Sequence, residues 1–115
     1  MNRSVSLLRK AREVLKRDGW IQGELHFNGQ HCAIGAIEQA FDETTDAKPD
    51  AFSYEDLRTA KIVMGQVAGE LDPKSARAGY SNEAKIASFN DRRGRTMEEV
   101  LRLFNDSIRR VKEGV

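Results

Sequence analysis

Apolar residues recur with the i, i+3, i+4 spacing of a one-sided helix along three stretches of the chain. Segments in which this spacing is lost separate the three stretches. The apolar positions are Val5, Leu8, Ala11, Val14 and Leu15 in the first stretch, Leu57, Ala60, Met64, Val67, Ala68 and Leu71 in the second, and Val100, Leu101, Phe104, Ile108 and Val111 in the third. The pattern therefore predicts three long amphipathic helices.

Residues at the ends of these stretches predict where each helix begins and ends. Ser4, Ser53 and Thr96 stand at N-cap positions, where a side-chain oxygen accepts a hydrogen bond from a free backbone N–H group. Thr96 also opens a capping-box pattern. Gly19 follows the first helix and predicts a left-handed C-terminal cap. Asp72-Pro73 ends the second helix, because proline does not continue the helical hydrogen bonding.

Two further elements are expected between the first and second long helices. Residues 20–31 lose the helical spacing and carry Asn28-Gly29, a strong signal for a tight turn between strands. We expect a small hairpin-like insertion that leans on helices, since a two-stranded ribbon alone is marginally stable. Residues 32–41 are rich in alanine and predict a short buried helix. Gly35 lies inside it at a cost of about 1 kcal/mol relative to alanine, which indicates that another helix approaches closely.

The rest of the chain is predicted to form shorter and more polar segments. We expect loops over residues 42–50 and 74–82, a short helical turn over 83–89 and a basic turn over 92–95. Residues 1–115 then form a single all-α domain. It is a compact helical bundle of three long helices and one or two short ones, with the hairpin-like insertion near residues 20–31.

Length and composition narrow the class of protein. The 115 residues leave room for one domain. Hydrophobic residues make up 39% and charged residues 32%, a polar composition that still supports a core. No apolar run approaches the roughly 18 residues that cross a bilayer, and the first residues do not resemble a signal peptide. We therefore expect a cytoplasmic protein that does not contact a membrane.

The chain has one cysteine and two histidines. A single cysteine excludes an internal disulfide and a multi-cysteine zinc site. No spacing matches a zinc or calcium pattern, and there is no glycine-rich phosphate loop. The sequence therefore predicts neither a metal nor a cofactor. It leaves the oligomeric state open, a homodimer included.

The net charge of +1 hides an uneven distribution. Residues 1–17 carry a net charge of +5, residues 18–37 of −2, residues 38–72 of −6 and residues 73–115 of +4. Such segregation indicates that the two ends meet in the fold or face different partners. Three pairs have the favourable i, i+4 orientation for ion pairs within helices: Glu13 with Arg17, Glu98 with Arg102, and Asp106 with Arg110.

Three short motifs resemble those of an uncharacterised family of small proteins found in actinobacteria and their phages. The motifs are Gly19-Trp20, the segment Cys32-Ala33-Ile34-Gly35-Ala36, and an aromatic residue followed by Asn90-Asp91. The resemblance covers residues 19–41 and 86–111. The aromatic position, often Trp in that family, is Phe89 here. The resemblance implies an actinobacterial or phage origin and a helical fold, and it implies no reaction.

Cys32 is the residue with the clearest nucleophilic chemistry. It stands at the first turn of a predicted helix, where free N–H groups and the helix dipole favour a thiolate. His26 or His31 could supply the base and Asn90 or Asp91 the orienting group of a thiol-dependent hydrolase or transferase. A cysteine flanked by alanine and isoleucine is more often a small buried hydrophobic residue, and we rank this interpretation above the catalytic one.

Two groups of residues are candidates for binding a partner. Arg9, Arg12 and Lys16 share one face of the first helix, opposite its apolar stripe. The second group is Trp20, Asn90, Asp91, Arg92 and Arg93. Each has a structural alternative: Trp20 can cover the core, Asn90-Asp91 can cap or turn the backbone, and basic side chains can simply be solvated.

The leading interpretation is a small helical interaction module rather than an enzyme. It would be phage-encoded or phage-derived and would bind a host or phage protein through its charged helical faces. A thiol-dependent enzyme is the first alternative. Nucleic-acid binding through the first helix and residues 92–95 is the second, against which stand a pI near 7.9 and the acidic middle of the chain.

Overall fold

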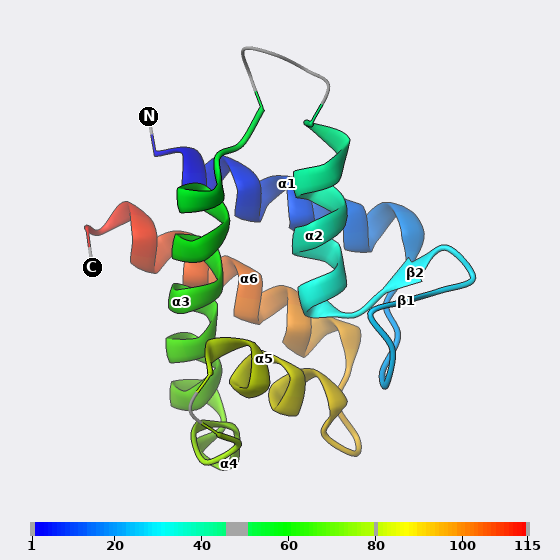
Figure 1. Ribbon diagram of the computed structural model, residues 1–115. Helices are drawn as coiled ribbons and strands as arrows, with labels where there is room; N and C mark the ends of the chain where they lie inside the picture. Colours follow the sequence, from blue (N-terminus) through cyan, green and yellow to red (C-terminus); the bar gives the residue numbers. More distant parts are fainter. Residues whose placement is uncertain (1, 46–50, 80, 115) are drawn as a thin grey trace.

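The computed structural model describes residues 2–45, 51–79 and 81–114. Within these ranges the chain forms helices and one antiparallel two-stranded ribbon, which confirms the prediction of an all-α fold with a small hairpin (Figure 1). The elements are α1 (Arg3–Asp18), β1 (His26–Phe27), β2 (Gln30–His31), α2 (Ala33–Glu43), α3 (Tyr54–Leu71), α4 (Pro73–Ala76), α5 (Asn82–Asp91) and α6 (Met97–Lys112).

The helices form two layers that enclose the core. In Figure 1, α2, α3 and α5 lie in front of α1 and α6, and the hairpin projects from one side. The apolar stripes of the long helices meet between the layers, as the sequence pattern predicts. Among the side chains that are fully buried there are Leu7, Leu8, Leu15, Ile37, Met64, Ile86, Leu103 and Phe104.

Most of the predicted helix ends are confirmed. Gly19 ends α1 as predicted, but its φ of 101° and ψ of 160° lie outside the left-handed helical region, so the predicted left-handed cap is not formed. Ser53 and Thr96 each form a complete capping box, at the starts of α3 and α6. Ser4 was predicted as the cap of the first helix, and this is wrong. Asn2 takes that place and accepts a hydrogen bond from the Ser4 N–H, so α1 begins earlier, at Arg3.

Two predictions between α3 and α6 are corrected. Residues 74–82 were predicted as a loop, but α4 forms at its start because Asp72 caps the Lys74 N–H and Pro73 occupies the first turn, where proline is favoured. The helical turn predicted over 83–89 is the longer helix α5, capped by Ser81. The predicted loop over 42–50 is helical up to Glu43, and its residues 46–50 lie outside the described ranges.

The hairpin turns at Asn28 and Gly29, whose φ angles of 53° and 77° suit the tight turn that this dipeptide favours. His26 pairs with His31, and Phe27 with Gln30. The backbone around Trp20 continues the ribbon on the other side of β2, where the His31 N–H donates to Gly19 O and the Ile21 N–H to His31 O, each at 3.0 Å. The hairpin is therefore tied to the end of α1.

Gly35 allows a close approach, but not of another helix as predicted. A Cβ atom at this position would overlap the backbone carbonyl oxygen of Leu25. The same carbonyl accepts a hydrogen bond from the Cys32 N–H at 3.1 Å. The missing side chain thus lets the segment before β1 lie directly against the first turn of α2.

The segregated charges meet in the fold. Arg17 Nη2 lies 2.6 Å from Glu43 Oε2, and Lys10 Nζ lies 3.4 Å from Glu43 Oε1, so the basic first helix is joined to acidic α2. Arg3 reaches Asp56 in α3 at 3.3 Å. The three predicted i, i+4 pairs are wrong, because their arginines find other carboxylates. The observed pairs are Arg17 with Asp18 and Glu43, Arg102 with Asp106, and Arg110 with Glu70.

Candidate functional site

Asn90 joins three separate parts of the chain. Its Oδ1 accepts hydrogen bonds from Trp20 Nε1 at 2.7 Å and from the Ala33 N–H at 2.9 Å. Its Nδ2 donates to Ile21 O at 3.1 Å and to Asp91 Oδ1 at 2.9 Å. Asn90 is buried, and both its oxygen and its amide nitrogen bond within the fold. It therefore caps the start of α2 from the end of α5 and offers no free polar group to a partner.

The neighbours of Asn90 hold the loop before the hairpin. Asp91 Oδ1 accepts a hydrogen bond from the Gly23 N–H at 3.0 Å. Gln22 Nε2 donates to Asn90 O at 3.0 Å and to Arg92 O at 2.8 Å. The bonds from Gln22 satisfy backbone carbonyl groups at the end of α5. The last carbonyl groups of a helix have no hydrogen-bond partner within the helix itself. The Asn-Asp pair thus ends a helix rather than forming a turn.

Cys32 is the N-cap of α2. Its Sγ accepts a hydrogen bond from the Gly35 N–H at 3.3 Å, and only 6% of the residue is exposed. Burial raises the pKa of the thiol above its ordinary value of 9.0, against the lowering effect of the helix N–H groups. Cys32 borders a small pocket of about 190 Å³ together with Leu25, Ile34, Ala87 and Asp91. A buried, protonated thiol is a poor nucleophile.

The two histidines contact each other and not the thiol. His26 Nδ1 lies 2.8 Å from His31 Nδ1, and His31 Nε2 lies 2.8 Å from Asp18 Oδ2. An ionised carboxylate only accepts, so His31 donates from Nε2. With both rings neutral, His31 Nδ1 then accepts the proton of His26 Nδ1, and the lone pair of exposed His26 lies on Nε2. No described hydrogen bond links either imidazole to Cys32, so the geometry gives no support to thiol catalysis.

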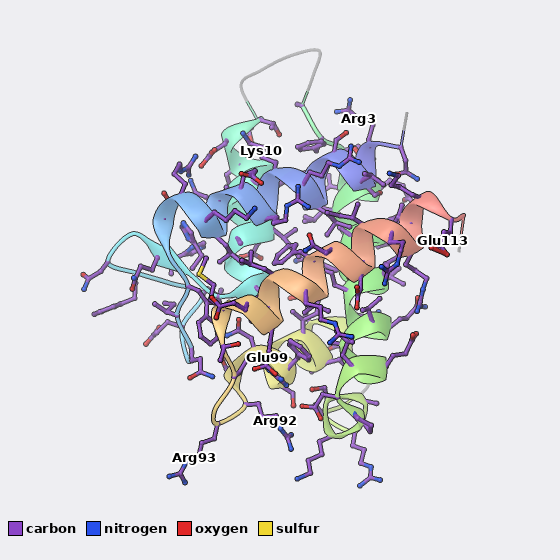
Figure 2. The ribbon with its side chains drawn as sticks, turned by 180° about the vertical axis from the view of Figure 1, so that it is seen from behind. Arg3, Lys10, Arg92, Arg93, Glu99 and Glu113 are labelled. Atoms are coloured by element: carbon purple, nitrogen blue, oxygen red, sulfur yellow. The ribbon has the colours of Figure 1, made fainter. Side chains whose placement is uncertain are left out.

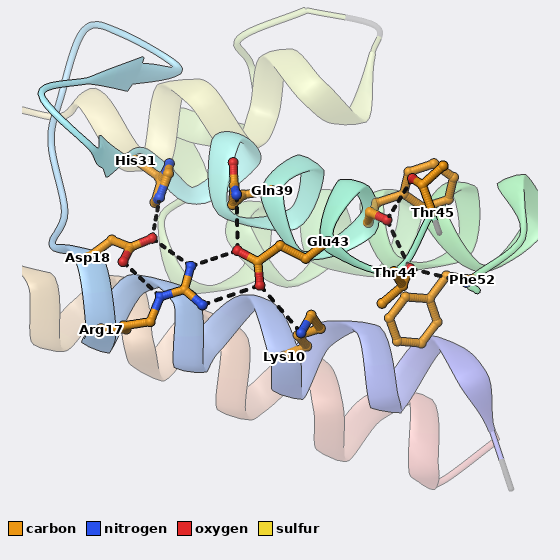
Figure 3. Close-up of polar contacts among 10 residues, drawn as sticks. Lys10, Arg17, Asp18, His31, Gln39, Glu43, Thr44, Thr45 and Phe52 are labelled. Atoms are coloured by element: carbon orange, nitrogen blue, oxygen red, sulfur yellow. Dashed lines mark hydrogen bonds and ion pairs between the residues drawn. The ribbon is translucent and has the colours of Figure 1, made fainter. Parts of the chain in front are cut away.

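Asp18 connects this histidine pair to an ion-pair network on α1 and α2 (Figure 3). Arg17 binds both Asp18 oxygens, at 2.7 and 2.8 Å, and also reaches Glu43. Hydrogen bonds from Arg17 and His31 hold the pKa of Asp18 well below its usual range. Those from Arg17, with a smaller contribution from Gln39, lower the pKa of Glu43 to about 2. The network ties the hairpin, α1 and α2 together.

The first basic group lies on the face shared by α1 and α6, which Figure 2 shows side by side. Arg12 Nη1 donates to Asn105 Oδ1 at 2.8 Å and so bridges the two helices. Arg12 and Asn105 line a groove of about 540 Å³ with Ile108, Arg109, Lys112 and Glu113, which we name the α1–α6 groove. Arg9 and Lys16 of the predicted face are exposed on α1 nearby.

The second basic group lies at the end of the molecule formed by α4 and the turn before α6. Arg93 points outward there, whereas Arg92 lies towards α4 (Figure 2). Asp72 Oδ2 binds Arg92 Nε at 3.2 Å and Arg95 Nη2 at 2.7 Å, which fixes the turn against α4. Arg95 also stacks on Phe89, 3.7 Å from the ring centre. Of the basic turn, Arg95 is structural, whereas exposed Arg93 makes no ion pair with any residue of the described ranges.

The structure therefore separates the predicted site residues. Trp20, Asn90 and Asp91 gather in one place with Cys32, where they hold the fold, whereas the arginines and Lys16 lie on two other surfaces. Sequence reasoning missed Asp18 and Gln22, which are tied to the hairpin and to the end of α5. In the sequence, the only feature that could have pointed to the role of Asp18 is its position beside the glycine that ends the first helix. No sequence feature pointed to the role of Gln22.

The described residues contain neither a side-chain cluster that could hold a metal ion nor a helix that could cross a membrane. Within residues 2–45, 51–79 and 81–114, no three histidine, cysteine or acidic side chains gather in an arrangement that could hold a metal ion. No helix in the same ranges is long and apolar enough to cross a membrane.

The chain matches the model of a known protein family. A family of unknown function, DUF6197, matches residues 2–110, so the chain belongs to this family. No curated protein and no solved structure matches the chain.

Proposed function

We propose that this chain is a small helical interaction module of actinobacterial or phage origin, which binds an acidic segment of a host or phage protein in the α1–α6 groove. The resemblance of its three motifs to proteins of actinobacteria and their phages supports the origin. We place the module in the cytoplasm, where a lone free thiol such as Cys32 remains reduced.

The observation that carries the proposal is a groove that three basic side chains share with one isoleucine. Arg12, Arg109 and Lys112 line it together with Ile108, which is 6% exposed. Arg12 pairs with Glu13 and Arg109 with Asp106, so Lys112 supplies the groove's unpaired charge among the described residues. Arg9 and Lys112 make no ion pair within the described part of the chain, so their charges remain available. An acidic segment with one apolar anchor would match this arrangement, because burial of the anchor supplies affinity and the rim charges direct the encounter.

A protein suits this groove better than a nucleic acid does. Glu113 lines the groove and Glu13 lies 3.4 Å from the groove residue Arg12, each with 61% of its side chain accessible. A nucleic-acid backbone is uniformly negative and would meet both carboxylates. A protein segment can place basic residues against them and acidic residues against the arginines.

The test uses a labelled acidic amphipathic peptide, followed by fluorescence anisotropy. We expect binding that weakens as salt is added, because exposed charges are screened. The double variant Arg9→Glu with Lys112→Glu should lose at least tenfold in affinity, about 1.4 kcal/mol. Arg58→Glu with Arg77→Glu, a matched double charge reversal at exposed positions outside the groove, should bind like the wild type. Equal losses in both variants, or no binding at low salt, would contradict the proposal.

A second candidate function, nucleic-acid binding, rests on the end formed by α4 and the turn before α6. Lys74, Arg77 and Arg93 are exposed and make no ion pair with a described residue. Asp72 at the same end is already bound to Arg92 and Arg95. A gel shift with double-stranded DNA tests this function. It should be lost in Arg77→Glu with Arg93→Glu and kept in Arg9→Glu, and it should weaken steeply with salt.

A further inference from the structure

The exposed large hydrophobic side chains of the described residues fall on two features. Leu25 and Phe27 flank His26 on the hairpin and are 47% and 59% exposed. Tyr54 and Ile62 lie on α3 and are 77% and 37% exposed. None of these residues belongs to the α1–α6 groove. Exposed apolar groups gathered in this way mark surfaces that bind another molecule.

The hairpin is a firmly held projection (Figure 1). Leu25 O accepts from the Cys32 N–H, and His26 is bonded to His31. Asp91 holds Gly23 just before the hairpin. The segment Leu25–Phe27, which precedes the Asn28-Gly29 turn and which we name the hairpin tip, is therefore held against β2 and the start of α2. A rigid binding element loses little conformational entropy when it binds.

The second feature is a groove between α3 and the start of α5, which we name the α3–α5 groove. It has a volume of about 420 Å³, and Tyr54, Leu57 and Ile62 supply its apolar surface. Its position is fixed by a close approach of the two helices, because a Cβ atom at Gly65 would lie within 3 Å of three Asn82 atoms. The groove is large enough to take an aromatic and an aliphatic side chain together.

We propose that the hairpin tip of one copy of this chain binds in the α3–α5 groove of a second copy. Phe27 and Leu25 would cover the exposed surfaces of Tyr54 and Ile62, so one contact buries the large exposed apolar groups of both features. One pair of flanking charges also matches, while Glu83 and Lys61 of the groove are paired with each other at 3.5 Å. Glu24 makes no ion pair within the described residues, and exposed Arg58 stands at the groove with only exposed Glu55 as its partner, at 3.5 Å.

The two halves of this contact are different surfaces. Such a heterologous contact can be made twice between two copies or can continue to further copies. In both cases a chain lacking only its hairpin tip still offers a groove, and a chain lacking only its groove still offers a tip. This complementarity separates the proposed contact from general hydrophobic association.

Sedimentation equilibrium over a wide dilution series tests the contact. The weight-average mass of the wild type should rise with concentration above the 13.0 kDa of one chain. Phe27→Ser alone and Ile62→Ser alone should each remain at one chain. Both positions are solvent-exposed, and circular dichroism checks that the variants stay folded. Glu98→Ser, an exposed change at the start of α6 outside both grooves, serves as the control and should associate like the wild type.

The decisive sample is an equal mixture of the two variants. It should form a dimer and nothing larger, because only one tip and one groove remain between the two chains. A wild type that stays a single chain at every concentration overturns the proposal. This is the result expected if the groove binds a different protein. Association of either variant alone at wild-type strength, or a mixture that stays monomeric, overturns it equally.

Discussion

Trp20 Nε1 donates a hydrogen bond of 2.7 Å to Asn90 Oδ1, across 70 positions of the chain. The same oxygen accepts from the backbone N–H of Ala33, at the first turn of α2. The bond therefore unites the Gly-Trp motif, the motif that starts at Cys32 and the Asn-Asp motif. Their shared role is to close the fold around the end of α5.

Replacing Asn90 with alanine should destabilise the protein by about 3 kcal/mol or more. The change leaves the Trp20 and Ala33 N–H groups and the Ile21 carbonyl without their partner, and each unsatisfied buried group costs about 1–3 kcal/mol. Urea unfolding followed by circular dichroism measures the loss. Asn105→Ala is the matched control, since that asparagine is exposed and its side chain bonds only to Arg12 among the described residues, and it should cost about 0.5 kcal/mol at most. Similar losses in both variants would contradict the role assigned to Asn90.

Alanine at Gly35 should destabilise the protein, although alanine is normally favoured over glycine inside a helix by about 1 kcal/mol. The new Cβ would overlap Leu25 O, a backbone atom that cannot move without opening the hairpin. Amide hydrogen exchange at Cys32, whose N–H bonds to the same oxygen, should become faster. Gly69→Ala is a milder comparison, because its Cβ would meet the Ala76 side chain at 3.1 Å. A Gly35→Ala variant as stable as the wild type would show that the hairpin does not lie against α2.

The periodic parts of the fold were predictable from sequence. The three apolar stripes, the Asn28-Gly29 turn and the capping boxes at Ser53 and Thr96 each depend on residues close together in the chain. Local hydrogen bonds and one-sided burial decide these features, so a single sequence carries the information. The start of α4 was missed because Asp72, its N-cap, is also the residue at which the sequence predicts the end of α3.

The candidate site was predictable only as a set of residues. The partner of Asn90 is 70 positions away, and that of Gly35 is a carbonyl group in an irregular segment. Nothing in the local pattern states which backbone group a buried amide will bond. The same holds for the ion pairs, where Arg17 prefers Asp18 and Glu43 to the carboxylate one helical turn before it. Tertiary contact decides these choices.

Acid should remove the stability that Glu43 contributes. Hydrogen bonds from Arg17 lower the pKa of this carboxyl from its ordinary 4.5 to about 2. A depressed pKa means that the contribution is complete above pH 4.5 and is lost as the pH falls from 4.5 towards about 2. Glu43→Gln should therefore be less stable than the wild type at neutral pH, by about 1 kcal/mol given solvent screening of the pair.

Thermal unfolding of both proteins across the acid range tests this prediction. The difference between them should shrink over the same interval and vanish near its lower end. Glu98→Gln, an exposed change at the start of α6, should leave the stability unaltered at every pH. A difference between wild type and Glu43→Gln that stays constant with pH would show that the glutamate does not act through its charge.

Cys32 should react slowly with iodoacetamide in the folded protein. The nucleophile is the thiolate, and burial raises the pKa of this thiol above 9.0 while leaving 6% of the residue exposed. Intact-mass measurements should show far faster labelling in urea than in buffer at the same pH. Cys32→Ser should fold, because a serine oxygen can accept the Gly35 N–H in the same N-cap position. Rapid labelling of the folded chain below about pH 8 would instead indicate an activated thiolate and would favour the thiol-dependent enzyme over the interaction module.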